Sequence, residues 1–192
     1  MHGHHSVSSQ SDIQALKSVL HKYPNFPVKG VLFEDFLPIF RDPSLFRKLI
    51  NAFKIHLEKV YQTQKIDYIV GLEARGFLIG PSLALAMGVG FVPIRKAGKL
   101  PGECVRTVYE KEYGKDTFEL QVSAIPPGSN VIVIDDIIAS GGTAMAAQDL
   151  LNQISVNVLE YDFVLELDFL NGKKNLGSPV FTLLSEQEFA LH

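Results

Sequence analysis

The chain of 192 residues has one cysteine, no tryptophan and a formal charge of only −3. Because Cys104 has no second cysteine to pair with, an internal disulfide is excluded and a reducing cytoplasm is the expected compartment. The small negative charge, without a basic stripe, argues against nucleic acid as a partner. No apolar run approaches the length of a membrane span, and the polar N-terminus lacks a signal-peptide core, so we expect no membrane association.

The composition is that of a globular protein with one real core. Hydrophobic residues make up 46% and charged residues 20% of the chain, which is ordinary for a folded domain. We predict a single domain over residues 11–192. Residues 1–10, with His2, His4 and His5, are interpreted as a disordered tail or a remnant of an expression vector rather than as a metal site.

The clearest chemical pattern runs from residue 131 to residue 143 and reads V-I-V-I-D-D-I-I-A-S-G-G-T. Four β-branched residues without alternation, Val131 to Ile134, predict a strand buried on both faces of a parallel sheet. Asp135 and Asp136 are expected where this strand ends, followed by a loop of small residues. Residues 144–151 then favour a helix.

This predicted strand, loop and helix would suit a phosphate. Glycines let the backbone approach a ligand closely, and a helix N-terminus offers free N–H groups and a positive dipole end to an anion. Ser140 and Thr143 add hydroxyl donors, and the acid pair suits sugar hydroxyls or a hydrated Mg²⁺. The stretch is neither G-x-x-x-x-G-K-[ST] nor G-x-G-x-x-G, so the common nucleotide loops do not explain it. The alternative is a tight strand-to-helix turn with incidental acids.

A second unit of the same kind lies earlier in the chain. Residues 67–71 predict a buried strand, which enters a loop containing Arg75, and a helix follows from about residue 77 to 87. Loops that follow parallel strands share one edge of the sheet. Arg75 is therefore expected to bind a phosphate there through two parallel hydrogen bonds. The alternative is that Arg75 pairs with a nearby acid for structural reasons alone.

The next strand, predicted over residues 91–94, ends in Arg95 and Lys96, with Lys99 close behind. A polar, glycine-containing stretch from residue 97 to 117 follows and is too long for an ordinary connection. We interpret it as a lid or as disorder. Residues 105–109 and 117–122 are possible arms of a hairpin within it.

The N-terminal part predicts a helix from Ser11 that ends before Pro24. An aromatic loop over residues 26–36 follows, and its phenylalanines either plug the core or form a slot for a planar ring. Asp42 and Pro43 are typical of a helix start. His56, within that helix, is interpreted as a surface or packing residue.

Two further strands, over residues 158–167 and 180–184, complete an alternation of strands and helices. Such an alternation predicts an α/β domain with a parallel sheet and right-handed crossovers. Ligands of such a domain bind at the carboxyl ends of the strands.

Four segments carry a resemblance to a known family. The stretch at residues 131–143 is similar to the phosphoribosyl-pyrophosphate (PRPP) loop of the type I phosphoribosyltransferases. Three others resemble the adenine phosphoribosyltransferases: F-P-V-K-G-V-L-F-E-D, G-L-E-A-R-G-F-L-I-G-P-S-L-A, and I-R-K-A-G-K-L-P-G with Y-E-K-E-Y-G-K-D. The resemblance covers roughly residues 23–184. It implies a type I phosphoribosyltransferase fold, a central parallel sheet flanked by helices, with a small hood and a flexible lid loop at about residues 98–118.

That resemblance implies an enzyme of purine salvage. It would transfer the 5-phosphoribosyl group of PRPP to adenine, giving AMP and pyrophosphate, with Mg²⁺, as a cytoplasmic homodimer. One alternative is a phosphoribosyltransferase for another 6-substituted purine. Another is a PRPP-sensing regulator without turnover, and a third is a flavodoxin-type nucleotide-binding module.

The resemblance also implies roles for individual residues. Asp135 and Asp136 would lie by the ribose hydroxyls and hold the metal through PRPP and water. Glu112 would handle the proton at adenine N7, and Arg75 would take up charge on the leaving pyrophosphate. The remaining substrate-binding residues would be Leu32 and Phe33 at the adenine, Glu73 and Ala74 in the pyrophosphate loop, Arg95, Lys96 and Lys99 near the pyrophosphate, Tyr113 over the site, and Ala139, Ser140, Gly141, Gly142 and Thr143 around the 5′-phosphate.

One position departs from the family pattern. Glu34 stands where many members carry an arginine near the base. An acid there could shift the base preference, accept a hydrogen bond from an exocyclic amine, or point to solvent. In the last case Leu32 and Phe33 would read the base alone.

Overall fold

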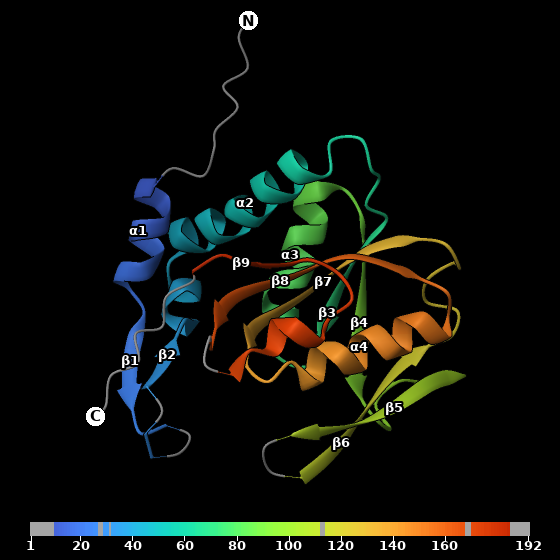
Figure 1. Cartoon of the computed structure of the whole chain (residues 1–192). Helices are drawn as coiled ribbons and strands as arrows, with labels where there is room; N and C mark the ends of the chain where they lie inside the picture. Colours follow the sequence, from blue (N-terminus) through green and yellow to red (C-terminus); the bar gives the residue numbers. More distant parts are fainter. Residues whose placement is uncertain (1–9, 27–28, 31, 112–113, 168–169, 185–192) are drawn as a thin grey trace, which may run out of the picture.

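The computed structural model describes residues 10–26, 29–30, 32–111, 114–167 and 170–184. A sheet of seven strands runs through it in the order β5-β6-β4-β3-β7-β8-β9 (Figure 1). The strands from β4 to β9 in this order are parallel to one another, and β5 and β6 form an antiparallel edge. Their bounds are β3 Tyr68–Leu72, β4 Gly90–Lys96, β5 Cys104–Lys111, β6 Gly114–Gln121, β7 Asn130–Ile138, β8 Asn157–Glu166 and β9 Val180–Thr182.

Helices cover both faces of the sheet. On one face lie α2, Pro43–Val60, and α3, Gly76–Met87, whereas α4, Gly142–Gln153, lies on the other. The predicted cap of α2 is confirmed, because the Asp42 side chain accepts hydrogen bonds from the amides of Ser44 and Leu45. Among the described residues, the short 3-10 helices η1, Leu37–Arg41, and η3, Gly172–Asn175, lie before α2 and β9 respectively. In the described part of the chain, no helix has both the length and the apolarity that a membrane span needs.

The central strand β7 shows why its sequence does not alternate. Val131 and Val133 pack into the cluster beneath α4, whereas Ile132 and Ile134 pack into the cluster beneath α2 and α3. All four side chains are fully buried. A strand covered on both faces needs apolar residues at every position, as the sequence predicted.

The hairpin predicted within the long polar stretch is confirmed. Strands β5 and β6 pair along their whole length, with Val105 opposite Leu120 and Tyr109 opposite Asp116. Tyr109 and Phe118 are buried and pack together, their ring centroids 4.6 Å apart. The described part of the predicted lid is therefore largely an ordered ribbon.

The N-terminal segment folds differently from its prediction. Helix α1, Gln10–Ser18, begins one residue before the predicted domain boundary and ends well before Pro24. Strand β1, His21–Pro24, then pairs with β2, Leu32–Asp35, where the sequence predicted the end of a helix and a loop. Short strands with exposed side chains carry no apolar alternation, so the pattern could not reveal them.

The same pairing places Glu34 opposite Lys22. The Glu34 carboxylate lies 3.4 Å from the Lys22 ammonium, and Glu34 is only 5% exposed. Of the three possibilities for Glu34, the one in which it points to solvent is therefore wrong.

Candidate active site

The two predicted anion loops meet because β3 and β7 are neighbours. Their parallel register places Gly71 beside Ile134, so the segments that follow them share one edge of the sheet. A cavity of about 270 Å³ opens there. Ten of its lining residues were predicted from the sequence, and Tyr109 and Ile137 were not; the ten are Glu73, Ala74, Arg75, Asp135, Asp136, Ala139, Ser140, Gly141, Gly142 and Thr143.

The acid pair lies within β7 rather than after it, which corrects the predicted strand end. The paired register of β3 stops at Gly71, but β8 continues to pair with β7 as far as Ile138. Asp135 and Asp136 therefore stand beyond the stretch of β7 that pairs with β3, while β8 still holds their backbone. This arrangement fixes two carboxylates rigidly in the wall of the cavity.

Both carboxyl groups of the pair are almost fully buried, at 8% and 4% exposed. Burial raises the pKa of Asp135 well above its ordinary value, and the neighbouring charge of Asp136 raises it further. Burial also raises the pKa of Asp136, although the Arg75 guanidinium opposes the shift. The Arg75 Nε atom lies 2.8 Å from Asp136 Oδ2. Arg75 thus pairs with an acid, as the structural alternative expected, and it also lines the cavity.

The loop before α4 has a conformation that only glycine suits. Gly141 has a φ of +85°, and a Cβ atom there would lie 2.6 Å from the carbonyl oxygen of Gly172. Because Gly141 is the N-cap of α4 and has no side chain to cap it, the first N–H groups of the helix remain available to an anion. The predicted phosphate cradle therefore has the required backbone.

The basic residues at the end of β4 and just after it are linked to the cavity through Glu73. Arg95 donates hydrogen bonds to the Glu73 carboxylate at 3.2 and 3.5 Å, and the Lys96 amide donates another at 2.9 Å. Burial opposes ionisation of Glu73, but the Lys96 amide and the Arg95 guanidinium outweigh it and lower the pKa of Glu73. The Lys99 carbonyl accepts from Arg95 Nη1 at 3.4 Å. These three basic residues therefore lie behind the cavity wall rather than in it.

The predicted adenine residues are not brought to this cavity. None of its described lining residues comes from β2, which carries Leu32 and Phe33. The Phe33 ring meets the Phe26 ring edge-on, with centroids 5.1 Å apart. Glu112 and Tyr113, predicted in the lid, lie outside the described residues.

Sequence reasoning missed Tyr109, which brings the hairpin to the cavity. The residue is 7% exposed and lines the same cavity as the acid pair. Burial raises the pKa of the Tyr109 hydroxyl, and the charges of Asp116 and Asp135 raise it further. The sequence did place Tyr109 in a predicted arm of the hairpin. The alternation of side chains along a strand does not, however, show which aromatic ring faces a cavity.

The sequence is similar to that of known phosphoribosyltransferases. The phosphoribosyl transferase domain family matches residues 39–164. Adenine phosphoribosyltransferase 1 of Saccharomyces cerevisiae is 66% identical over 185 residues, covering 96% of this chain and 99% of that protein.

Solved structures agree in fold as well as in sequence. The adenine phosphoribosyltransferase of Saccharomyces cerevisiae, complexed with an imino-altritol bisphosphate and adenine, has a TM-score of 0.89 and 67% identity, covering 92% of this chain and all of that one. The enzyme of Giardia lamblia, complexed with 9-deazaadenine, has a TM-score of 0.81 and 31% identity, covering 92% of this chain and 98% of that one. The family match and these relatives show that the chain belongs to the adenine phosphoribosyltransferases.

Proposed function

We propose that the protein transfers the 5-phosphoribosyl group of PRPP to adenine and releases AMP and pyrophosphate. One observation carries the proposal: two loops suited to anions and a pair of buried acids converge on a single cavity. PRPP requires this combination, since it presents a phosphate, a diphosphate and a ribose diol at once. The close relatives named above are adenine phosphoribosyltransferases, which supports adenine as the acceptor.

Each wall of the cavity has a part in the proposed reaction. Residues 139–143 would hold the 5′-phosphate on the N-terminus of α4. Glu73, Ala74 and Arg75 would hold the pyrophosphate, and the ribose hydroxyls would face Asp135 and Asp136. Cleavage at the ribose C1 carbon develops positive charge on the sugar and negative charge on the leaving pyrophosphate. Arg75 would stabilise that negative charge in a site that excludes water.

The buried acid pair also fits Mg²⁺. Carboxylate oxygens are the ligands this ion prefers, and Mg²⁺ usually keeps waters and substrate oxygens in its coordination sphere. Asp135 and Asp136 would therefore hold it through PRPP and water. When bound, Mg²⁺ would neutralise charge on the pyrophosphate.

The hairpin would supply the chemistry at the base. Glu112 and Tyr113 fall between β5 and β6, and Tyr109 of the same hairpin already lines the cavity. Glu112 would handle the proton at adenine N7, while Tyr113 would cover the site, and Leu32 and Phe33 would bind adenine. An acid carried on a lid acts only when the lid is closed, which limits hydrolysis of PRPP. We place this reaction in the cytoplasm, where the single thiol stays reduced.

The test is AMP formation from adenine, PRPP and Mg²⁺, with hypoxanthine, guanine and 2,6-diaminopurine in parallel. Turnover with adenine alone supports the proposal. Turnover with another base keeps the reaction but assigns a different 6-substituted purine. Tight binding of PRPP without turnover on any base would instead indicate a PRPP-sensing regulator.

Glu34 is expected to have no part in choosing the base. Its carboxylate is engaged by Lys22 across the β1–β2 pair. We therefore expect Glu34→Gln to leave the ratio of kcat/KM for adenine to that for 2,6-diaminopurine unchanged within about twofold. A larger change in the ratio would show that Glu34 contacts the base.

We also propose that the protein is a homodimer, because α3 is apolar on the side that the sheet does not cover. Leu78 and Leu85, two turns apart on α3, are 42% and 85% exposed. Apolar side chains on the outer face of a helix are typical of a subunit interface. Helix α3 begins directly after the proposed pyrophosphate loop.

A charge on that face should break the dimer. Leu85→Glu is expected to shift the protein from dimer to monomer, because it would bury an unpaired carboxylate in the interface. Light scattering coupled to size-exclusion chromatography measures the mass directly. Val122→Glu, at another exposed apolar residue, is the matched control and should leave the mass unchanged. A Leu85→Glu protein of unchanged mass would place any interface elsewhere.

A further inference from the structure

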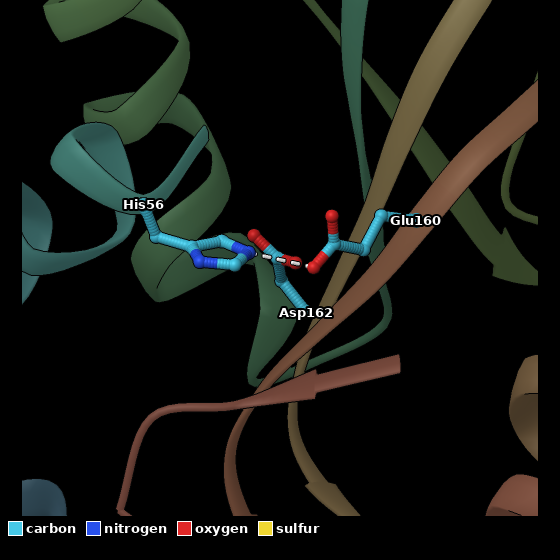
Figure 2. A group of neighbouring side chains, drawn as sticks. All are labelled: His56, Glu160 and Asp162. Atoms are coloured by element: carbon cyan, nitrogen blue, oxygen red, sulfur yellow. Dashed lines mark hydrogen bonds and ion pairs between the residues drawn. The ribbon is translucent and has the colours of Figure 1, made fainter. Parts of the chain in front are cut away.

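We propose that His56, Glu160 and Asp162 form a binding site for a zinc ion on the α2 face of the sheet. His56 comes from α2, and Glu160 and Asp162 alternate along β8 so that both point toward that helix (Figure 2). One ligand atom from each of the three side chains lies within 4.8 Å of the other two. None of them lines the substrate cavity, so the site is distinct from the proposed active site.

The buried, unpartnered carboxylate of Asp162 is the feature that indicates a ligand. Its side chain is fully buried, and neither carboxylate oxygen has a hydrogen-bond partner. Burial raises the pKa of Asp162 well above its ordinary value, and the nearby charge of Glu160 raises it further. A buried carboxylate without a partner is costly unless it gains a proton or a cation. Figure 2 shows the carboxylate directed between His56 and Glu160.

The rest of the cluster is already held in place. Glu160 Oε1 lies 2.6 Å from His56 Nε2, and Glu160 Oε2 accepts a hydrogen bond of 2.7 Å from the Tyr61 hydroxyl. The His56 ring stacks on Phe181 at 3.5 Å between centroids. Such outer contacts orient metal ligands and fix the ring of a coordinating histidine. Among the described residues, Glu160 pairs with His56. No lysine or arginine of the described chain pairs with the Asp162 carboxylate.

The chemistry of the three groups favours zinc over the ions that use oxygen alone. Zinc binds both imidazole nitrogen and carboxylate oxygen, the two donor types that this cluster offers, whereas Mg²⁺ and Ca²⁺ take oxygen ligands. His56 would coordinate through Nε2 in place of its present contact with Glu160. Because the His56 side chain is 20% exposed, an ion can reach the cluster, and water can occupy the fourth position. The ion would tie α2 to β8 and would take no part in the transfer reaction.

Zinc titration of the full-length chain by calorimetry tests the proposal. The protein is first stripped with a chelator, and His2, His4 and His5 are replaced by asparagine so that the N-terminus does not bind the metal. We expect about one zinc ion per chain from this cluster and a higher Tm when zinc is present. MgCl₂ at the same concentration should not raise the Tm through this site.

Two variants assign the ion to the cluster. Asp162→Asn removes an anionic ligand but keeps its shape, and His56→Gln keeps a donor for Glu160 but loses the imidazole. Each is expected to lower the zinc affinity at least about tenfold to a hundredfold. Asp149→Asn, on the exposed face of α4, removes one negative charge elsewhere and should bind zinc like the parent.

The Asp162→Asn variant also distinguishes a zinc site from a site in which Asp162 simply carries a proton. A neutral Asp162 could donate a hydrogen bond to Glu160, and an asparagine amide can do the same. If the parent protein binds no zinc, the proposal is overturned. An Asp162→Asn variant that then keeps or raises the Tm at neutral pH would indicate that a proton occupies the site instead. Zinc binding that survives in both variants would also overturn it, because the ion would then lie elsewhere.

Discussion

Replacing Asp136 with asparagine is expected to lower kcat/KM for PRPP by about a hundredfold to a thousandfold. The change keeps the shape of the side chain and removes one negative charge from the wall of the cavity. Arg75 then loses the carboxylate that holds its Nε atom at 2.8 Å. Because the Asp136 side chain is almost fully buried, water has little access to the position of the lost charge. Steady-state kinetics with varied PRPP at saturating adenine and Mg²⁺ measure the loss.

Stability should move in the opposite direction from activity. The pKa of Asp135 is higher in the folded protein than in the unfolded chain, so a proton on Asp135 stabilises the folded state. This contribution to the free energy of unfolding is lost as the pH rises through the raised pKa. Asp136→Asn removes the neighbouring charge that raises the pKa of Asp135, while the Arg75 guanidinium continues to lower it. We expect the Tm of the variant at neutral pH to equal or exceed that of the parent. A scan of Tm against pH should show a smaller decline toward neutral pH in the variant.

Asp135→Asn is the companion variant, and Asp149→Asn on the surface is the control. The control should change neither the PRPP kinetics nor the pH profile. Unchanged PRPP kinetics in both Asp135→Asn and Asp136→Asn would remove the acid pair from the proposed site. If the variants lost a large part of their Tm together with their activity, the acid pair would serve folding instead. Acids that bind ligand at the expense of stability should give a more stable protein when their charge is removed.

Several parts of this site followed from the sequence because each depends on neighbours along the chain. The unbroken run from Val131 to Ile134 shows that a strand is covered on both faces. The small residues that follow it show where the backbone must approach a ligand. Once two such units are placed in one parallel sheet, the meeting of Arg75 and Asp136 at one edge requires only that β3 and β7 be neighbours.

Other parts depended on contacts between segments that no local pattern records. The β1–β2 pair is held by cross-strand contacts, such as that of Lys22 with Glu34, in strands too short and polar to be recognised. His56 was interpreted as a surface or packing residue because its two acidic neighbours lie more than 100 positions away. The packing half of that interpretation agrees with its stack on Phe181, but the carboxylates beside it were not foreseen.

Glu119 was missed for the same reason, and it leads to the second large effect. In an alternating strand a single glutamate suggests a solvent-facing position, yet the Glu119 side chain is fully buried. Its Oε1 atom accepts hydrogen bonds of 2.8 Å from the amides of both Lys99 and Leu100, and Oε2 accepts one of 3.2 Å from Arg106. Glu119 thus holds the turn after β4, whose Lys99 carbonyl contacts Arg95.

We expect Glu119→Gln to lower kcat/KM for PRPP by about a hundredfold, although Glu119 does not touch the cavity. The amide cannot accept all of these hydrogen bonds with one remaining oxygen, so the turn at Lys99 should lose its fixed position. Arg95 and its hydrogen bonds to Glu73, in the proposed pyrophosphate loop, depend on that turn. The KM for PRPP should therefore rise far more than the KM for adenine, a split that a general loss of structure would not produce.

The pH dependence of stability separates this carboxylate from the acid pair. Burial opposes ionisation of Glu119, but the amides of Leu100, Gly98 and Lys99 outweigh it and lower its pKa from 4.5 to about 2. A lowered folded-state pKa gives stability that is present above pH 4.5 and is lost as the pH falls toward 2. The Tm difference between the parent and Glu119→Gln should thus be largest near neutral pH and shrink below pH 4.5.

An exposed glutamate nearby provides the matched control. Glu103→Gln, just before β5, removes the same charge from the exposed start of the same ribbon, and its kinetics should match the parent. If Glu119→Gln raised the KM values for PRPP and adenine equally, Glu119 would support the hairpin as a whole. The split between the two substrates would instead mean that one buried carboxylate, acting through the backbone amides of the turn, positions the proposed pyrophosphate loop from outside the cavity.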